Sequence, residues 1–375
     1  RVNVLTQDGE TAIDLQKRRR EMLSVALDWN VNDDLQIQFD ASHKKSETRG
    51  LTSYWYFADQ ARRPDAKDLD NDKLYSQRWA FSDSEHDRIG SRFNWRLNDA
   101  LSLRGALGYS QYTSEYVYTG PTVNSPTAWS PGTPIGHYEQ PLYAFAPVET
   151  EETSGNLFLD AEFNTGSIGH KTTVGYQGNI ARERYYTDHV DAAFQQQSAV
   201  GQPPLTQTPQ VPKQNYSVGN GDQRLGSRTQ SDNFLIGDVI TFNEQWSSIL
   251  GLTHTTIKTS DSNFYWLKAY PFLNLTENNY NESKTSPNVS LIYKPQPWLT
   301  TYASYIEGLQ TGGTAPTDAL NAGQALAPQV SEQYEVGVKA TVGETLLTLA
   351  LFNIDKPNAY KNGDNLYVAD GRQEN

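Results

Sequence analysis

The chain has 375 residues, a formal net charge of −13 and no cysteine, which excludes disulfides, thiolate metal sites and cysteine nucleophiles. The acidic balance argues against nucleic acid as a partner. Tyrosine and tryptophan are abundant, with 22 and 8 copies, yet the mean hydropathy is −0.67. This combination is typical of a sheet protein whose strands each have one apolar face and are joined by long polar loops.

The first residues already predict a hairpin pattern. Residues 1–6 predict the end of a strand, and the Gln-Asp-Gly-Glu run at 7–10 predicts a turn. Residues 16–30 and 35–42 then predict two strands around a turn at 31–34. Within each strand, apolar and polar residues alternate with a period of two, which places them on opposite faces.

The same rhythm repeats along the rest of the chain: two strands around a tight turn, then a long polar loop. Tight turns are predicted at residues 98–100, 166–169, 243–245, 294–297 and 342–344. Long loops are predicted over residues 47–83, 119–148, 188–223, 262–282 and 310–328. The pattern predicts about 14 antiparallel strands in an up-and-down order, with short connections at one end and long ones at the other.

The length and polarity of these strands favour a membrane. They run to about ten residues or more, whereas strands of soluble sheets average about five or six. Their polar faces carry Arg, Asn, Asp and Gln, which are costly to bury unpaired in a dry core. No apolar run approaches the roughly 18 residues of a spanning helix. The strand length and the polar faces are both explained if the polar face lines a water-filled lumen and the apolar face contacts lipid. We therefore predict an all-β transmembrane antiparallel β-barrel.

The amino-acid sequence of residues 286–358 resembles that of a known family. The words SPNVSLIYKP, LTTYASYIEGLQTGG, EQYEVGVKA and LLTLALFNIDKPN occur there in this order. They resemble the middle of the β-barrel of TonB-dependent outer-membrane receptors, siderophore-receptor branch. The resemblance implies a barrel of 22 strands, of which about 14 are present, with short periplasmic turns, long extracellular loops and a plug domain inside. It identifies residues 1–375 as a partial barrel domain in which the N-terminal plug domain and the C-terminal strands are missing.

The resemblance also implies a function. Receptors of this kind take up ferric siderophores across the outer membrane of Gram-negative bacteria without covalent chemistry. The expected partners are the ferric siderophore, the TonB-ExbB-ExbD complex acting through the missing plug domain, and outer-membrane lipid with lipopolysaccharide. No intrinsic cofactor is expected, and the siderophore is cargo. The sequence does not decide which siderophore is carried, or whether the cargo is instead haem, cobalamin or a metal–citrate chelate.

The candidate ligand residues are aromatic and basic side chains of the long loops. Aromatic rings stack on planar chelating groups, and arginine suits an anionic complex. The four consecutive aromatics at 54–57 cannot all bury on one strand face, so either they stack on ligand or they pack the loop over the barrel mouth. The candidates are Tyr54, Trp55, Tyr56, Arg62, Tyr116, Trp129, Tyr265 and Trp266.

Other kinds of site have weaker support. Asp68, Asp70 and Asp72 have the spacing that opens a calcium loop, but Lys73 replaces the turn glycine and Trp79 the closing glutamate. A solvated acidic run is the alternative. The histidines show no zinc spacing, and no catalytic motif is present, so we do not expect an enzyme. The remaining alternatives are a passive porin and a soluble β-rich glycan-active protein.

Overall fold

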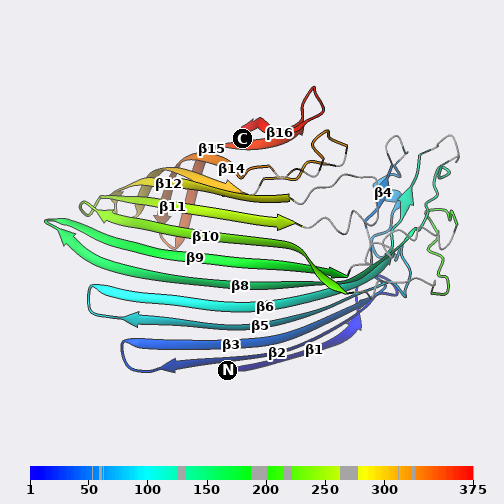
Figure 1. Ribbon diagram of the computed structural model, residues 1–375, viewed down its shortest axis with the longest axis horizontal. Helices are drawn as coiled ribbons and strands as arrows, with labels where there is room; N and C mark the ends of the chain where they lie inside the picture. Colours follow the sequence, from blue (N-terminus) through cyan, green and yellow to red (C-terminus); the bar gives the residue numbers. More distant parts are fainter. Residues whose placement is uncertain are drawn as a thin grey trace.

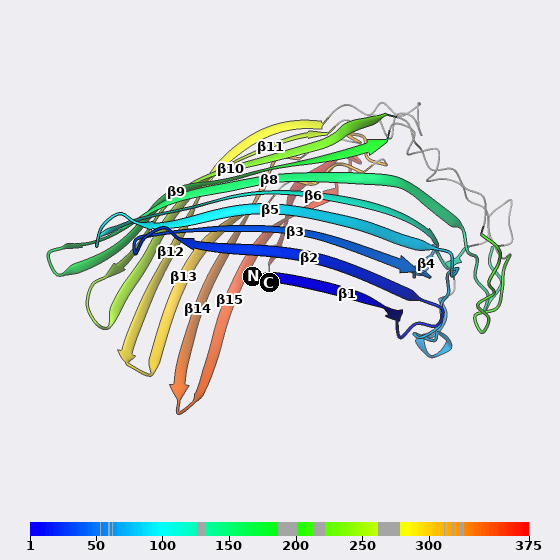
Figure 2. The ribbon, with the colours of Figure 1, turned by 90° about the horizontal axis from the view of Figure 1, so that it is seen from below.

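The computed structural model describes residues 1–52, 54–58, 61, 63–125, 132–186, 201–213, 222–261, 278–310, 312–316, 318–322, 324 and 326–374. Within these residues, 14 strands form one antiparallel sheet in which each strand pairs with its neighbours in sequence (Figure 1). This confirms the predicted strand number and the up-and-down order. The sheet order places β1 and β16 at the two edges, and the sheet curls strongly between them (Figure 2).

The strands of the large sheet are long. They are β1 (Val2–Glu10), β2 (Lys17–Asn30), β3 (Leu35–Arg49), β5 (Phe81–Arg96), β6 (Leu101–Thr119), β8 (Leu142–Thr165), β9 (Ile168–Tyr186), β10 (Gln223–Thr241), β11 (Trp246–Asp261), β12 (Asn278–Gln296), β13 (Leu299–Gln310), β14 (Gln329–Val342), β15 (Thr345–Lys361) and β16 (Tyr367–Glu374). A small parallel pair, β4 (Tyr56–Phe57) with β7 (Thr122–Val123), lies apart from it. The 3₁₀ helix η1 spans Ala66–Asp68, and none of the described helical residues forms a segment suited to crossing a membrane.

The two ends of the sheet differ as the sequence predicted. Tight turns gather at one end and the long connections at the other (Figure 1). The turns between β8 and β9 and between β14 and β15 have two residues each, and each begins with a glycine, Gly166 at φ 63° and Gly343 at φ 62°. This left-handed conformation is strained for residues with a Cβ and free for glycine.

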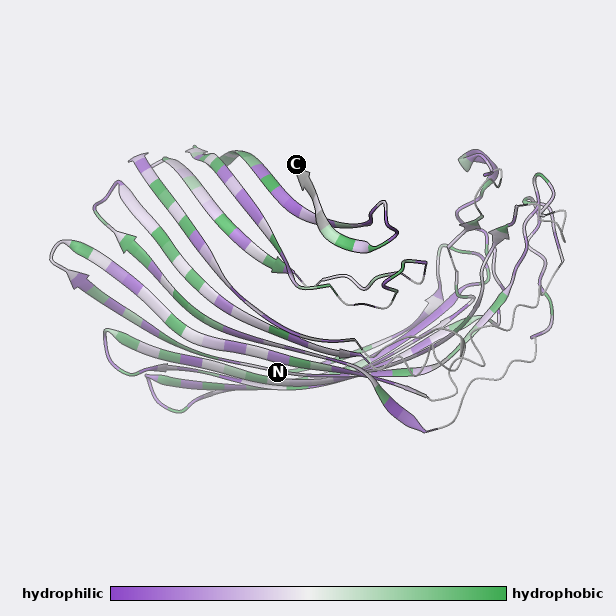
Figure 3. Cartoon of the chain, turned by 45° about the horizontal axis from the view of Figure 1, so that its top comes forward, coloured by the Kyte–Doolittle hydropathy of each residue, from purple (hydrophilic) through white to green (hydrophobic). Residues whose placement is uncertain are grey.

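Hydropathy alternates along the strands, so the sheet has an apolar face and a polar face (Figure 3). Leu107 on β6 is 69% exposed and Leu349 on β15 is 64% exposed, because none of the described elements covers the apolar face at these positions. Arg104 and Ser110 take the alternate positions of β6, on the polar face. An apolar face left exposed over so many strands is the pattern of a lipid-facing barrel wall.

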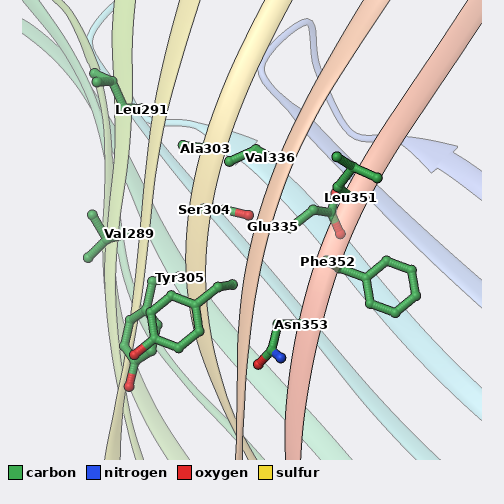
Figure 4. A pocket seen from close by; sticks show the side chains of 11 residues that line it. Val289, Leu291, Ala303, Ser304, Tyr305, Glu335, Val336, Leu351, Phe352 and Asn353 are labelled. Carbon is green, nitrogen blue, oxygen red and sulfur yellow. The ribbon is translucent and has the colours of Figure 1, made fainter. Parts of the chain in front are cut away.

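The apolar face is hollowed over β12–β15. Ala303 pairs with Leu291 on one side and Val336 on the other, and its small side chain leaves a groove of about 500 Å³ between them (Figure 4). Tyr305 and Tyr334 border the groove, with ring centroids 4.9 Å apart. Because the groove lies on the apolar face, it belongs to the part of the barrel wall that a bilayer would cover.

Two local predictions were wrong. Residues 7–10 continue β1 instead of turning, because Asp8 and Glu10 pair across the sheet with Arg19 and Lys17. The turn predicted at 294–297 has shifted to residues 297–298, and Pro295 stays in β12. A register irregularity between Tyr293 and Gln296 accommodates it.

The tryptophans near strand ends divide into two groups. Trp29, Trp95, Trp246 and Trp298 lie exposed near the tight turns, which is the arrangement of an interfacial girdle. Trp79 lies at the other end of the sheet, where it packs over Val117 and donates its indole N–H to the Val211 carbonyl at 2.9 Å. The interfacial arrangement therefore fits four of these tryptophans, whereas Trp79 packs among the loop residues.

Candidate functional site

A group of stacked aromatic side chains lies where β6 and β8 reach the loop end of the sheet. Tyr116 pairs across the strands with Phe145, and Tyr118 pairs with Tyr143. The ring centroids are 4.6 Å apart in the first pair and 5.0 Å in the second, and both pairs are stacked. Cross-strand aromatic pairs of this kind stabilise a sheet and fix the ring orientations.

Tyr56 extends this group from a neighbouring loop. Its hydroxyl lies 3.3 Å from the Tyr118 hydroxyl, and its ring centroid lies 6.4 Å from that of Tyr143. The backbone of β4 is held in place because the Tyr56 N–H donates to the Pro121 carbonyl at 2.9 Å. We call Tyr56, Tyr116, Tyr118, Tyr143 and Phe145 the aromatic ladder.

The aromatic ladder belongs to the polar face. Tyr112, Tyr116 and Tyr118 follow Ser110 at every second position of β6, so they share the face of Arg104. The four rings on β6 and β8 are partly buried, and Tyr56 is 40% exposed. The ladder thus offers partly open ring faces at the loop end of the lumen-facing wall, where a flat aromatic or conjugated ligand can stack.

Trp55 and Phe57, on either side of Tyr56, face a separate cluster in the loops. Trp55 packs against Tyr75 and Tyr138 with ring centroids 5.1 and 5.4 Å apart. We call the cluster formed by Trp55, Phe57, Tyr75, Val123, Tyr138 and Leu205 the loop core. Alternation over residues 55–57 therefore splits the run, with Tyr56 on the ladder side and Trp55 and Phe57 on the loop-core side.

A buried polar network supports the loop core. Gln77 and Gln140 are fully buried, and the Gln77 amide donates to the Gln140 side-chain oxygen at 2.7 Å. The Ser76 and Thr119 hydroxyls, also buried, lie 3.1 Å apart beside them. Because every buried amide here has a partner, the network fixes one arrangement of the loops.

Residues 201–213, from the connection between β9 and β10, complete this network through hydrogen bonds to residues 76–78. The Val211 N–H donates to the Gln77 side chain at 2.9 Å, and the Gln77 amide donates to the Pro209 carbonyl at 2.9 Å. Gln210 donates to the Ser76 carbonyl at 3.0 Å and accepts from the Arg78 N–H at 2.8 Å. We call residues 201–213 the strap, because they bind a loop that lies more than a hundred positions earlier in the chain.

Tyr138 is the titratable group at the centre of the loop core. Its hydroxyl donates to the Gln207 carbonyl at 2.8 Å and accepts from the Gln140 amide at 3.2 Å. Burial raises the pKa of Tyr138 from 10.0 to about 12, because the charged phenolate would lose its hydration.

A cavity of about 440 Å³ lies beside the loop core, under residues that follow β3. Trp55, Leu69 and Tyr75 form part of its wall, and Lys73 stands at its polar side. Trp55 therefore borders a loop cavity instead of the aromatic ladder, and its main contacts are structural.

The acidic run near this cavity is held by a lysine. The Asp70 carboxylate lies 3.0 Å from the Lys73 ammonium, and this hydrogen bond lowers the pKa of Asp70 and raises that of Lys73. In the described part of the chain, no group of three or more His, Cys, Asp or Glu side chains has a geometry suited to a metal ion. Lys73 therefore neutralises one carboxylate of the acidic run.

The structure places the predicted ligand residues in different surroundings. Tyr56 and Tyr116 come together in the aromatic ladder. Trp55 faces the loop core, and Tyr54 is 84% exposed. Arg62, Trp129, Tyr265 and Trp266 lie outside the described residues.

Three ladder residues were absent from that list: Tyr118, Tyr143 and Phe145. Tyr143 and Phe145 alternate with Leu142 and Ala144, so a strand signal was present in the sequence. It was hidden because the loop was expected to continue to residue 148, whereas β8 begins at Leu142.

The chain is similar to known receptors over its whole length. It is 24% identical over 386 aligned residues to the ferrichrome receptor FcuA of Yersinia enterocolitica, covering 100% of this chain and 47% of FcuA. It is 23% identical to the metal-pseudopaline receptor CntO of Pseudomonas aeruginosa, covering 96% of this chain and 48% of CntO.

Solved structures agree in fold. The ferric preacinetobactin receptor BauA of Acinetobacter baumannii superposes with a TM-score of 0.77 at 23% identity, over 100% of this chain and 53% of BauA. The pyoverdine-bound receptor FpvA of Pseudomonas aeruginosa gives a TM-score of 0.76 at 14% identity, over 98% of this chain and 47% of FpvA.

The chain spans about half the length of the curated relatives that it matches. A family model described as TonB dependent receptor-like, beta-barrel, matches residues 28–373, which is most of the sequence. With the 14-stranded sheet, its apolar outer pattern and its unlike ends, this match shows that the chain belongs to the TonB-dependent receptor β-barrel family.

Proposed function

We propose that this chain is part of the barrel wall of an outer-membrane receptor that takes up ferric siderophores in a TonB-dependent way. The observation that carries the proposal is the aromatic ladder, which stands on the polar face at the long-loop end. The long loops then face the outside of a Gram-negative bacterium, and the tight turns face the periplasm. The protein binds and passes its ligand without covalent chemistry, so it is not an enzyme.

The ladder suits a ferric siderophore for a geometric reason. Tyr116 and Phe145 stack at 4.6 Å, and both remain partly exposed on the face that lines the lumen. The chelating groups of siderophores are flat and conjugated, so they stack on such rings with little loss of side-chain freedom. The hydroxyls of Tyr56 and Tyr118 add hydrogen-bonding groups at the edge of the stack.

The relatives support the same cargo class, since their printed names specify ferrichrome, metal-pseudopaline and ferric preacinetobactin. The proposed partners are the ferric siderophore, the TonB-ExbB-ExbD complex acting through a plug domain, and outer-membrane lipid with lipopolysaccharide at the apolar face. Iron enters as cargo bound to the siderophore, and no resident cofactor is proposed.

The test is ligand binding to the full-length receptor, purified in detergent. Ferric siderophores are titrated while tryptophan fluorescence is followed, and saturable quenching by one chelate class is expected. Tyr116→Ala should weaken that binding about tenfold or more, because a stacked ring contributes on the order of 1–3 kcal/mol. Tyr334→Ala is the matched control, since Tyr334 is 54% exposed on the apolar face.

Two outcomes would change the assignment. If a folded receptor binds haem, cobalamin or a metal–citrate chelate and no siderophore, the cargo is wrong while the transport class stands. If no chelate binds and small solutes pass freely through the protein in vesicles, a passive porin replaces the proposal.

A further inference from the structure

Positive and negative side chains on the polar face lie in different parts of the sheet. On β2, β3 and β5, polar-face positions carry several cations that have no counter-ion within the described parts of the chain, whereas Glu152, Glu183 and Asp261 occupy polar-face positions of β8, β9 and β11. The face assignment follows from the pairing register, because residues directly opposite each other on neighbouring strands share a face. The wall is therefore basic on one side of the aromatic ladder and acidic on the other.

Some cations of the basic side are neutralised locally. The Arg88 side chain lies 3.7 Å from the Asp40 carboxylate, and Arg104 lies 2.7 Å from Asp160. These pairs belong to the wall itself and leave little charge for a ligand.

Four other cations differ: Arg18, Arg20, Lys44 and Arg92. None of them lies within ion-pair distance of a carboxylate among the residues that the structure describes. Arg18 is partly buried, and its Nε is a buried donor without a hydrogen-bond partner. A buried N–H without an acceptor is costly, so an anion that reaches Arg18 Nε gains a hydrogen bond that the described wall does not satisfy. We call these four residues the cation stripe.

Arg18, Arg20 and Lys44 of the cation stripe lie near the aromatic ladder on one surface, whereas Arg92 pairs with Ala106, farther along β6. Arg18 pairs with Thr48, Thr48 with Ser82, and Ser82 with Tyr116. With strands about 4.8 Å apart, three steps place the Arg18 and Tyr116 backbones roughly 14 Å apart.

A second row of the sheet places another cation near Tyr112, which shares the polar face of β6 with Tyr116. Lys44 pairs with His86, and His86 pairs with Tyr112, so the Lys44 and Tyr112 backbones are about 10 Å apart by the same count. Arginine and lysine side chains are long enough to span much of these distances. A ligand stacked on the aromatic ladder can therefore contact the cation stripe on one side.

Ferric complexes differ in charge by their chelating groups. Three singly charged hydroxamates neutralise ferric iron, whereas three doubly charged catecholates leave the complex strongly anionic. A neutral complex gains little from unpaired guanidinium groups, while an anionic one forms charge-assisted hydrogen bonds with them. Catecholate rings also supply the aromatic faces that the ladder stacks.

We propose that this receptor selects anionic, aromatic ferric complexes of the catecholate class, with the cation stripe as the selecting element. The inference rests on the proposed function and goes beyond it, because one relative is named for ferrichrome and family membership does not choose between charge classes. The acidic side of the wall, with Glu152 and Glu183, strengthens the choice by repelling the complex toward the stripe.

The experiment compares two probes on the full-length receptor in detergent: a ferric tris-catecholate and a neutral ferric tris-hydroxamate. Dissociation constants are measured by fluorescence quenching at low and high salt. The wild type should prefer the tris-catecholate, and only that affinity should fall as salt rises.

The variant Arg18→Gln/Arg20→Gln should weaken tris-catecholate binding about tenfold per arginine and leave tris-hydroxamate binding unchanged. Arg19→Gln is the matched control. Arg19 lies between these two residues on the same strand but on the opposite face, where it pairs with Glu21 at 2.6 Å, so its loss should change neither affinity.

The outcomes separate the two proposals. Preference of the wild type for the neutral complex, or equal weakening of both complexes in the double variant, overturns the selection by charge. Equal weakening would mean that the stripe holds an acidic surface of the receptor itself. Failure of both complexes to bind a folded wild type would instead overturn the proposed function.

Discussion

The phenolic oxygens of Tyr56 and Tyr118 lie 3.3 Å apart. This contact joins a loop residue of β4 to a wall residue of β6. The residues before and after Tyr56 belong to the loop core, where Trp55 and Phe57 stack with centroids 6.1 Å apart. A displacement of the loop core therefore moves a member of the aromatic ladder directly.

Removing one of these two hydroxyls should weaken ligand binding modestly. Tyr118→Phe keeps the ring stack and deletes one side of the contact, so siderophore affinity should fall about two- to fivefold, consistent with a net hydrogen-bond contribution of about 1 kcal/mol. Tyr56→Phe should have a similar effect. Because both changes remove the same contact, the double variant should resemble each single one; additive losses in fluorescence titrations would show that the hydroxyls act separately.

The loop core should open at alkaline pH. Since burial raises the pKa of Tyr138 from 10.0 to about 12, its contribution to stability is fully present below pH 10 and is lost as pH rises through about 12. The expected result is increasing protease cleavage in residues 201–213 over that interval, in step with tyrosinate absorbance. Tyr138→Phe lacks the titrating group, so the same opening in this variant would contradict the assignment.

Gln77→Leu should release the strap. The substitution leaves the Pro209 carbonyl and the Val211 N–H without their partner, and the Gln140 side-chain oxygen keeps only the Thr119 hydroxyl at 3.2 Å. Each unsatisfied buried group costs about 1–3 kcal/mol, so limited proteolysis should cut residues 201–213 while the strands stay intact. The control is Gln36→Leu, because the Gln36 amide bonds to Asn30 in an exposed position. Equal protection of both variants would show that the network is dispensable.

Single cysteines should report the two faces of β6, since the chain has no cysteine of its own. Leu107→Cys lies on the apolar face and should react with a lipid-soluble thiol reagent, but not with a water-soluble one, in intact outer membranes. Ser110→Cys lies on the polar face and should show the reverse preference. Water-soluble labelling at position 107 that equals labelling at position 110 would remove the membrane-facing assignment.

Much of the sheet follows from the sequence because alternation is a local signal. Leu23, Val25 and Leu27 on one face of β2 predict both the strand and its apolar side, and the structure leaves all three exposed as a lipid-facing wall requires. The tight turn at Gly166 was predicted for the same reason, since a glycine between two alternating runs marks a hairpin.

The loop end could not be predicted in the same way, because its structure depends on contacts between distant segments. The sequence around Trp79 gives no sign that Val211 will accept its indole hydrogen. Likewise, the burial of Tyr138 depends on Leu205 and Gln207 of the strap. Local pattern identified Tyr56 and Tyr116 as ligand candidates, but it could not separate them from Trp55, whose neighbours come from other loops.

The bonds between the strap and the loop that begins after Arg49 limit how these receptors can exchange parts. Gln77 and Val211 are 134 positions apart, yet each satisfies the other. A loop transplanted alone into a relative would arrive without its matching acceptors and donors. Successful grafting of ligand specificity should thus require both segments to be moved as one unit, and inheritance by recombination faces the same requirement.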